Sequence, residues 1–275
     1  IQFIAKDNQI KVIECNLRAS RSFPFVSKVT KYNFIDLATK AMLGLDIKGK
    51  YNTLDLEYVG VKAPQFSFSR LHGADPVLSV EMASTGEVAC LGNDLNESFL
   101  KSLLSVGFVI PNSSVLLSTG PIKSKAYLLD SIKKLDEMGF KLYATEGTAK
   151  FLEQNGVKTT VLHWPLEMSE IARETISCAS AQSDTAISEH DQKLKVFDKK
   201  EPNVLTYIQE RKIELVINIP KSLEEKDLTN YYLIRRKAVD FNIPLLTNAQ
   251  IAKLFIESIY KKKMEDLEIK SWEEY

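Results

Sequence analysis

From Val115 onward, apolar strand-like segments alternate with amphipathic helical segments, and this alternation limits the possible folds more than any other feature. The first expected strand contains Leu116 and Leu117. Further strands are expected at 140–144, 157–162, 214–219 and 244–246. Helices are expected at 148–154, 204–211, 230–241 and 249–262. Strands joined by helices in this order predict an α/β domain, a doubly wound five-stranded parallel sheet with helices on both faces.

The first helix of this series shows both of its ends in the sequence. Apolar residues recur at helical spacing from Leu128 to Met138. Ser124 stands ahead of them as the expected N-cap, and Gly139 favours termination directly after them.

Composition divides the chain into segments of different character. Residues 1–98 mix short strands with Gly and Pro and are expected to form one unit. A linker is expected at 99–112, followed by the α/β domain at 113–275. Within that domain, residues 166–203 are rich in Ser, Lys, Glu and Asp and show no clear period, so they are expected to be a mobile insertion.

Charge and cysteine content argue against several functional classes. Lys plus Arg and Asp plus Glu each total 36, so no net charge favours nucleic acid or an anionic membrane as a partner. Cys15, Cys90 and Cys178 have no paired metal spacing and are too few for a disulfide scaffold. The chain starts without Met or a basic leader, so we expect a fragment of a longer protein.

The segment VIECNLRASRSFPF at 12–25 carries a first candidate site. Glu14, Asn16 and Arg18 alternate along an expected strand and would share one face. A carboxylate and an amide oxygen suit Mg²⁺, and a guanidinium suits the phosphates of a nucleotide. Periodicity alone favours the simpler alternative, the solvated face of an antiparallel sheet.

The turn ATEGT at 144–148 carries a second candidate site, because it joins an expected strand to an expected helix. The hydroxyls of Thr145 and Thr148 and the free N–H groups of the helix start would together form a cradle for a phosphate or carboxylate. Thr148 alone is equally explained as an N-cap.

In open α/β sheets, ligands bind outside the carboxyl ends of the strands. Besides the two threonines, Lys125, Trp164 and Asn218 are expected to face that crevice and to bind an anionic effector. Trp164 packing on the sheet and Asn218 satisfying a strand end are the structural alternatives.

Both segments resemble parts of one enzyme family. Glu14, Asn16, Arg18 and Arg21 with the following SFPF resemble the end of the ATP-grasp fold in carbamoyl-phosphate synthetases. The resemblance implies that Glu14 binds ATP and metal, that Asn16 binds the same Mg²⁺ or Mn²⁺, and that the two arginines act as catalytic residues on the phosphoryl group.

The string ATEGTAKFL at 144–152 resembles the anion-binding turn of the methylglyoxal-synthase-like domain, which ends these synthetases. The segment SRLHGADPVLSVEMASTGEVACLG at 69–92 resembles the family's connection from the ATP-grasp sheet to the rest of the enzyme. The resemblance therefore implies the C-terminal edge of an ATP-grasp domain followed by a regulatory domain.

By this resemblance, the parent enzyme makes carbamoyl phosphate from bicarbonate, ammonia or glutamine nitrogen, and two ATP. The present motif would belong to the half that phosphorylates carbamate. The implied partners are the upstream remainder of the synthetase, its glutaminase-like portion and a small anionic effector, and assembly into a homo-oligomer is left open. The isolated fragment is expected to be inactive.

Trp164, the INIP string at 217–220 and the run at 234–255 resemble the type activated by N-acetylglutamate, which works in the mitochondrial matrix. Lys221, Tyr231 and Lys125 depart from that type, and Lys125 resembles the nucleotide-regulated version. Three alternatives stay open. They are a purely regulatory anion-binding module, the synthetase part of the cytoplasmic pyrimidine-pathway multienzyme protein, and a methylglyoxal synthase, which Pro220, Lys221 and Ser222 disfavour because a carboxylate base is needed there.

Overall fold

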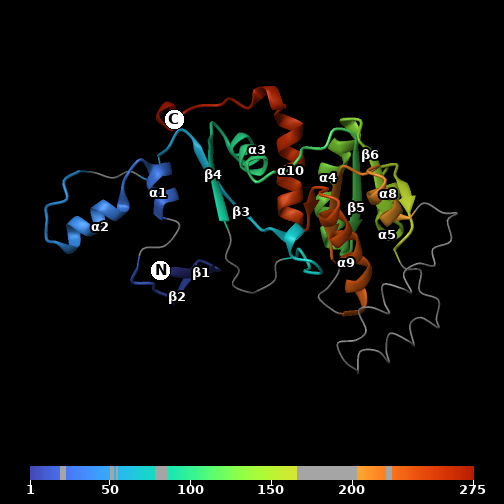
Figure 1. The fold of residues 1–275 in the computed structure, drawn as a ribbon, viewed down its shortest axis with the longest axis horizontal. Helices are drawn as coiled ribbons and strands as arrows, with labels where there is room; N and C mark the ends of the chain where they lie inside the picture. The colour runs from blue at the N-terminus through green and yellow to red at the C-terminus, as the bar shows by residue number, and fades with distance from the viewer. Residues whose placement is uncertain (19–22, 50–52, 54, 78–85, 166–202, 221–224) are drawn as a thin grey trace.

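The computed structural model describes residues 1–18, 23–49, 53, 55–77, 86–165, 203–220 and 225–275, which Figure 1 shows in colour. Arg21 and Lys221 lie outside the described residues. So does the expected mobile insertion at 166–203, apart from Asn203.

A five-stranded sheet organises the C-terminal part, with every neighbouring pair of strands parallel. Its strand order is β7-β6-β5-β8-β9. The strands are β5 (Ser114–Thr119), β6 (Lys141–Thr145), β7 (Thr160–Leu162), β8 (Leu215–Ile219) and β9 (Leu245–Leu246). The predicted doubly wound parallel sheet is therefore confirmed.

The two central strands, β5 and β8, are buried at every residue. A strand covered on both faces is apolar along most of its length instead of alternating, which is why VLL and LVI runs marked these strands in the sequence. The sheet grows from β5 in both directions: β6 and β7 are added on one side of β5, and β8 and β9 on the other.

Helices α4 (Ile122–Glu137), α5 (Glu146–Gln154) and α10 (Ala249–Lys261) cover one face of the sheet. Leu128, Leu152 and Phe255 pack there against strand residues such as Leu117 and Ile217. In Figure 1 α10 lies between α4 and α3, and it contacts both helices.

Helices α8 (Val204–Gln209) and α9 (Glu225–Asp240) cover the opposite face. Ile208 and Ile234 pack there against Leu116 and Val216 of the central strands. Helix α9 is thus fixed to the sheet by an apolar stripe, and its polar residues are left to make other contacts.

Helix α4 begins one turn earlier than predicted. Pro121 is its N-cap, and Ile122 is its first residue, so Ser124 lies in the first turn and is not the cap. The proline fixes φ near the helical value, but its ψ of 136° is extended, and the helix starts directly after it. The predicted end is confirmed, because Gly139 has a φ of 83° and donates its N–H to Asp136 O.

An antiparallel pair, β3 (Val59–Gln65) and β4 (Gly86–Gly92), packs against α3 (Leu95–Ser105). Residues 99–105 of the predicted linker are therefore helical. Phe99 and Leu100 are buried in the core that α4 and α10 share, and this burial explains why a helix forms here. The division into two domains stays a prediction.

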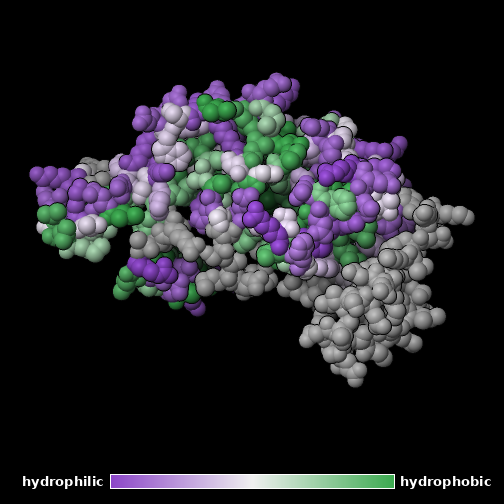
Figure 2. All heavy atoms as spheres, viewed as in Figure 1, coloured by the Kyte–Doolittle hydropathy of each residue, from purple (hydrophilic) through white to green (hydrophobic). Residues whose placement is uncertain are grey.

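The first 58 residues contain β1 (Gln2–Lys6), β2 (Gln9–Glu14), α1 (Phe23–Thr30) and α2 (Phe34–Met42). Among their described residues only Thr30 is buried. Every residue of the β1–β2 hairpin is exposed, and Figure 2 shows apolar atoms at the surface over these strands and α2. The ATP-grasp assignment of this part stays a prediction.

Strand β2 is shorter than predicted. It ends at Glu14, which is paired with Gln2 at the start of β1, so Asn16 and Arg18 follow the strand instead of alternating along it. The expectation of three side chains on one strand face is therefore wrong. The ladder between β1 and β2 ends at the Gln2–Glu14 pair, and a strand extends only as far as its backbone is paired.

Candidate functional site

The carboxyl ends of β5, β6 and β8 meet where the strand order changes direction, the usual place for a ligand in such a sheet. Thr119 ends β5, Thr145 ends β6, and Asn218 is the penultimate residue of β8. All three are buried. The sequence prediction placed Thr145 and Asn218 at this edge, and the structure brings them there.

Three hydroxyl groups, those of Ser118, Thr145 and Thr148, form a network between β5 and the start of α5. Thr148 Oγ1 accepts a hydrogen bond from Thr119 N at 3.0 Å and donates one to Thr119 O at 3.1 Å. Thr145 Oγ1 lies 3.4 Å from Ser118 Oγ and 3.5 Å from Thr148 Oγ1. Thr148 is therefore not the N-cap of α5; it fixes the helix start to the neighbouring strand.

The N-cap of α5 is Thr145, whose side chain makes no capping hydrogen bond. The positive end of the helix dipole therefore faces this edge of the sheet. Lys125, from the first turn of α4, donates from Nζ to Gly147 O at 2.6 Å and places a positive charge beside the same turn. The predicted proximity of Lys125 to the anion cradle is thus observed.

Two buried polar atoms at this edge have no hydrogen-bond partner among the described residues: Thr119 Oγ1 and Asn218 Nδ2. Their residues are 3% and 0% exposed. Buried polar atoms in folded proteins are nearly always paired, and exceptions concentrate where a ligand or water binds. One hydroxyl and one amide N–H₂ group are therefore available to a ligand.

Asn218 is held in place by a residue that the sequence did not reveal. Arg235 of α9 donates from Nη1 to Asn218 Oδ1 at 3.1 Å and from Nε to Asp75 Oδ1 at 2.8 Å. The sequence feature that could have indicated this residue is the pair Arg235 and Arg236 inside a helix that carries an apolar stripe. Ser118 and Thr119 were also missed, although two hydroxyl residues ending an apolar strand directly before Gly120 were a usable signal.

Trp164 follows β7 by two residues at the same edge of the sheet. Its ring contacts Tyr231 of α9 edge-on, with ring centroids 5.1 Å apart, and its carbonyl accepts a hydrogen bond from Asn203. This packing fits the structural alternative for Trp164. Within the described part of the chain, no hydrogen bond joins it to the hydroxyl network.

The first candidate site is only partly assembled. Asn16 Nδ2 donates to Glu14 Oε1 at 3.0 Å, and both residues are exposed, as is Arg18. A carboxylate beside an amide oxygen fits part of a Mg²⁺ site. Within the described residues there is no group of three His, Cys, Asp or Glu that would hold a metal ion. Glu14 and Asn16 as metal ligands stay a prediction.

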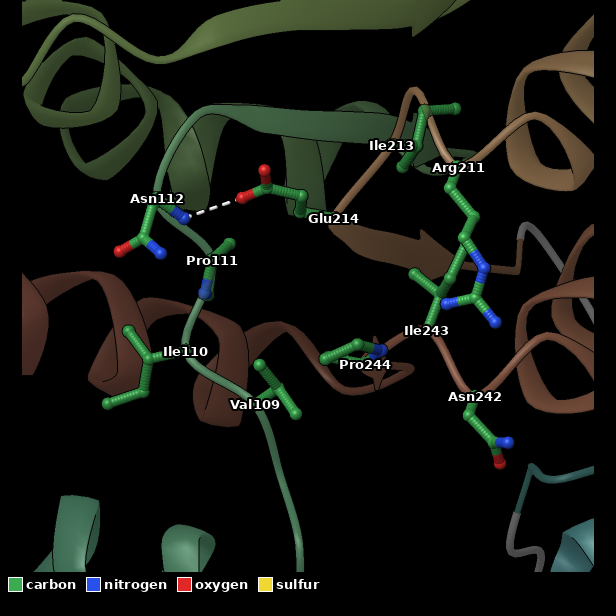
Figure 3. A pocket seen from close by; sticks show the side chains of 10 residues that line it. All are labelled: Val109, Ile110, Pro111, Asn112, Arg211, Ile213, Glu214, Asn242, Ile243 and Pro244. Atoms are coloured by element: carbon green, nitrogen blue, oxygen red, sulfur yellow. Dashed lines mark hydrogen bonds between the residues drawn. The ribbon is translucent and has the colours of Figure 1, made fainter.

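The pocket in Figure 3 lies at the opposite, amino-terminal edge of the sheet and contains none of the predicted effector residues. It measures about 330 Å³ and is lined by Val109, Ile110, Pro111, Asn112, Arg211, Ile213, Glu214, Asn242, Ile243 and Pro244. Glu214 accepts hydrogen bonds from Asn112 N, Ser113 N and Ser113 Oγ. These bonds, led by that of the Ser113 hydroxyl, lower the pKa of Glu214.

Residues 127–247 match the family model of the MGS-like domain. This part of the chain is an MGS-like domain. The match includes Thr145, Thr148, Trp164 and Asn218, whereas Lys125 and the hydroxyls of β5 lie just before it.

Proteins of two kinds resemble the whole chain. Multifunctional protein pyrABCN of Emericella nidulans is 49% identical over 265 residues, which is 94% of this chain and 10% of that protein. Multifunctional protein URA2 of Saccharomyces cerevisiae is 47% identical over 264 residues, 94% of this chain and 11% of that protein. The mitochondrial carbamoyl-phosphate synthase (ammonia) of Homo sapiens is 41% identical over 272 residues, 97% of this chain and 16% of that protein.

The chain thus spans between a tenth and a sixth of the length of these relatives. The similarity to both kinds of protein covers nearly all of this chain, so it includes the segment that precedes the MGS-like domain. Among the described residues, no helix has both the length and the apolar character needed to cross a membrane.

Proposed function

We propose that this chain is the C-terminal part of a carbamoyl-phosphate synthase, an ATP-dependent ligase, and that its MGS-like domain binds a small anionic effector. The relatives support the first part, because a carbamoyl-phosphate synthase and multifunctional proteins both match nearly the whole chain. The remaining synthetase and the glutaminase-like portion would then lie in the longer protein.

The observation that carries the effector site is the pair of unpartnered buried donors at the carboxyl edge, Thr119 Oγ1 and Asn218 Nδ2. They lie at the ends of neighbouring strands, β5 and β8, and Thr119 is bonded to the first turn of α5. Lys125 and the helix dipole add positive potential at the same turn. Donors together with positive charge select an anion with acceptor oxygens, such as a carboxylate or a phosphate.

N-acetylglutamate is the first candidate effector, on the resemblance of Trp164 and the INIP string to the type that it activates, and this candidate places the protein in the mitochondrial matrix. A uridine nucleotide is the second candidate. It is supported by Lys125 at the anion turn, and by the multifunctional proteins, which match at 42–49% identity against 41% for the mitochondrial synthases. This second candidate places the protein in the cytoplasm.

The first candidate site would give one wall of the ATP site for carbamate phosphorylation. Glu14 and the Asn16 amide oxygen would hold Mg²⁺ or Mn²⁺, and Arg18 and Arg21 would stabilise charge on the phosphoryl group. A bound metal ion would neutralise the polyphosphate. The exposure of Glu14 and Asn16 on the chain alone agrees with a site whose other wall is elsewhere in the parent protein.

Isothermal titration calorimetry of the 275-residue chain with N-acetyl-L-glutamate and with uridine 5′-triphosphate tests the effector proposal. We expect saturable binding of one of them with a stoichiometry near one. Acetate and uridine serve as controls, because acetate carries only one carboxylate and uridine lacks the negatively charged phosphates. The proposal fails if neither probe binds, or if the controls bind equally well.

A further inference from the structure

Among the described residues, Arg235 is the largest of the fully buried side chains, with 0% exposure. A buried guanidinium is tolerated only when its donors are paired, because desolvating the charge is costly. Its partners come from two distant parts of the chain. Nε and Nη2 bind the two carboxylate oxygens of Asp75, and Nη1 binds Asn218 Oδ1.

This arrangement fixes which way the amide of Asn218 faces. A guanidinium has only donors, so Asn218 must present its oxygen to Arg235. The amide nitrogen is consequently turned away from Arg235, where it is buried and has no partner among the described residues. Arg235 therefore determines that the site offers a donor at this position, and a ligand must supply an acceptor oxygen.

Asp75 belongs to the segment that joins β3 to β4, and this segment packs against α9 of the MGS-like domain. Helix α9 holds this segment at several points. Arg236 donates to Leu71 O and Ala74 O at 3.0 Å each, and Tyr232 Oη donates to Gly73 O at 2.9 Å. Of these α9 residues, only Arg235 also contacts the effector site.

We propose that Arg235 is a positioning residue that couples the effector site to the segment at 68–75. The coupling rests on the proposed effector site. An acceptor oxygen bound to Asn218 Nδ2 polarises the amide and makes Oδ1 a better acceptor for Arg235. The strengthened guanidinium contact restrains Asp75, and by thermodynamic reciprocity a restrained Asp75 favours ligand binding by the same factor.

Hydrogen exchange of the chain without ligand tests the coupling first. The reporter amides are Ala74 and Val77, because Ala74 N bonds to Leu71 O and Val77 N bonds to Asp75 Oδ1. We expect Asn218→Ala to raise their exchange rates at least threefold, since Arg235 loses one of its two partners. Thr119→Val is the control, because Thr119 lies at the same edge but has no hydrogen bond to Arg235.

Unchanged exchange in folded Asn218→Ala overturns the coupling, as does an equal rise in Thr119→Val. This measurement needs no ligand, so it decides the coupling even where neither calorimetric probe binds and the effector proposal fails. The test leaves Arg235 itself unchanged. Replacing this buried residue by lysine would leave Asp75 and Asn218 without their full set of hydrogen bonds, and such a variant would fail to fold.

A binding measurement then tests the reciprocal direction. We expect Asp75→Asn to weaken binding of the better of the two probes, N-acetyl-L-glutamate or uridine 5′-triphosphate, about fivefold, although Asp75 is no part of the effector site. Asp240→Asn is the matched control, because it removes the carboxylate partner of Arg236 on the same helix. Equal affinity in wild type and Asp75→Asn, or equal losses in both variants, contradicts the proposal.

Discussion

Glu214 shows how one carboxylate connects two segments that are distant in sequence. It accepts two backbone N–H groups and one hydroxyl from residues 112 and 113, directly before β5. The contacts join the start of β5 to the start of β8, its neighbour in the sheet. Because the ionised form accepts all three bonds, the pKa of Glu214 lies below its ordinary value of 4.5.

A lowered folded pKa means that the stabilisation is present above pH 4.5 and is lost as the pH falls through the folded value. We expect Glu214→Gln to lower the free energy of unfolding at pH 7 by about 1–2 kcal/mol, and to lower it much less at pH 3. Thermal unfolding at both pH values measures this. Glu153→Gln, an exposed position on α5, is the control. Equal losses at both pH values would contradict the assignment.

Much of the candidate site was predictable from single residues, and the rest was not. Thr145 and Asn218 lie at the carboxyl ends of apolar strands and Thr148 follows one, so the rule for open α/β sheets located them. Arg235 and Asp75 are 160 residues apart, and nothing local in either segment indicates their pairing. The failed prediction for Asn16 and Arg18 has the same origin, because the end of β2 depends on its pairing with β1.

The elements of the MGS-like domain were predicted almost entirely. Burial on both faces and helical spacing are local signals, and β8 was expected at 214–219 and found at Leu215–Ile219. Helix α3 was missed as an element because its buried face is short, and residues 99–105 were taken as linker. The close approach of β4 to α3 was equally invisible, and it depends on Gly92.

A Cβ atom at Gly92 would lie 2.5 Å from Ser98 N and 2.9 Å from Ser98 Cα, which are backbone atoms of α3. We therefore expect Gly92→Ala to lower the free energy of unfolding by about 2–3 kcal/mol, because α3 must shift away from β4. Gly86→Ala, at the other end of β4, has no atom within 4 Å of the added Cβ and is the control. Thermal unfolding of both variants gives the comparison, and equal stability would refute the close approach.

The whole chain combines an exposed N-terminal part with a well-packed C-terminal domain. The large apolar residues of β1 and β2, including Ile4, Ile10 and Val12, are more than half exposed. The relatives are six to ten times longer, so surfaces for these side chains to pack against are available in a parent protein. If the proposed function holds, the chain would contribute one wall of an ATP site and a regulatory MGS-like domain.

If Glu14 helps to hold the metal of the carbamate-phosphorylating half, its removal affects one of two partial reactions. In the whole synthetase, we expect Glu14→Gln to reduce ATP formation from carbamoyl phosphate and ADP at least 100-fold, and to leave bicarbonate-dependent ATP hydrolysis within about threefold. Both are measured by coupled assay. Asp7→Asn, in the hairpin turn, is the control. Equal losses in both reactions would refute the assignment.

The central claim is that a small anion binds at the carboxyl edge of the sheet, between β5 and β8. Thr119→Val replaces the unpartnered hydroxyl by a methyl group of similar size. The most direct test is calorimetric titration of this variant with the probe that binds wild type. Thr160→Val is the control, because Thr160 is the first residue of β7 and lies at the amino-terminal edge of the sheet. The account predicts at least tenfold weaker binding for Thr119→Val and wild-type affinity for Thr160→Val. Wild-type affinity in both variants would contradict it.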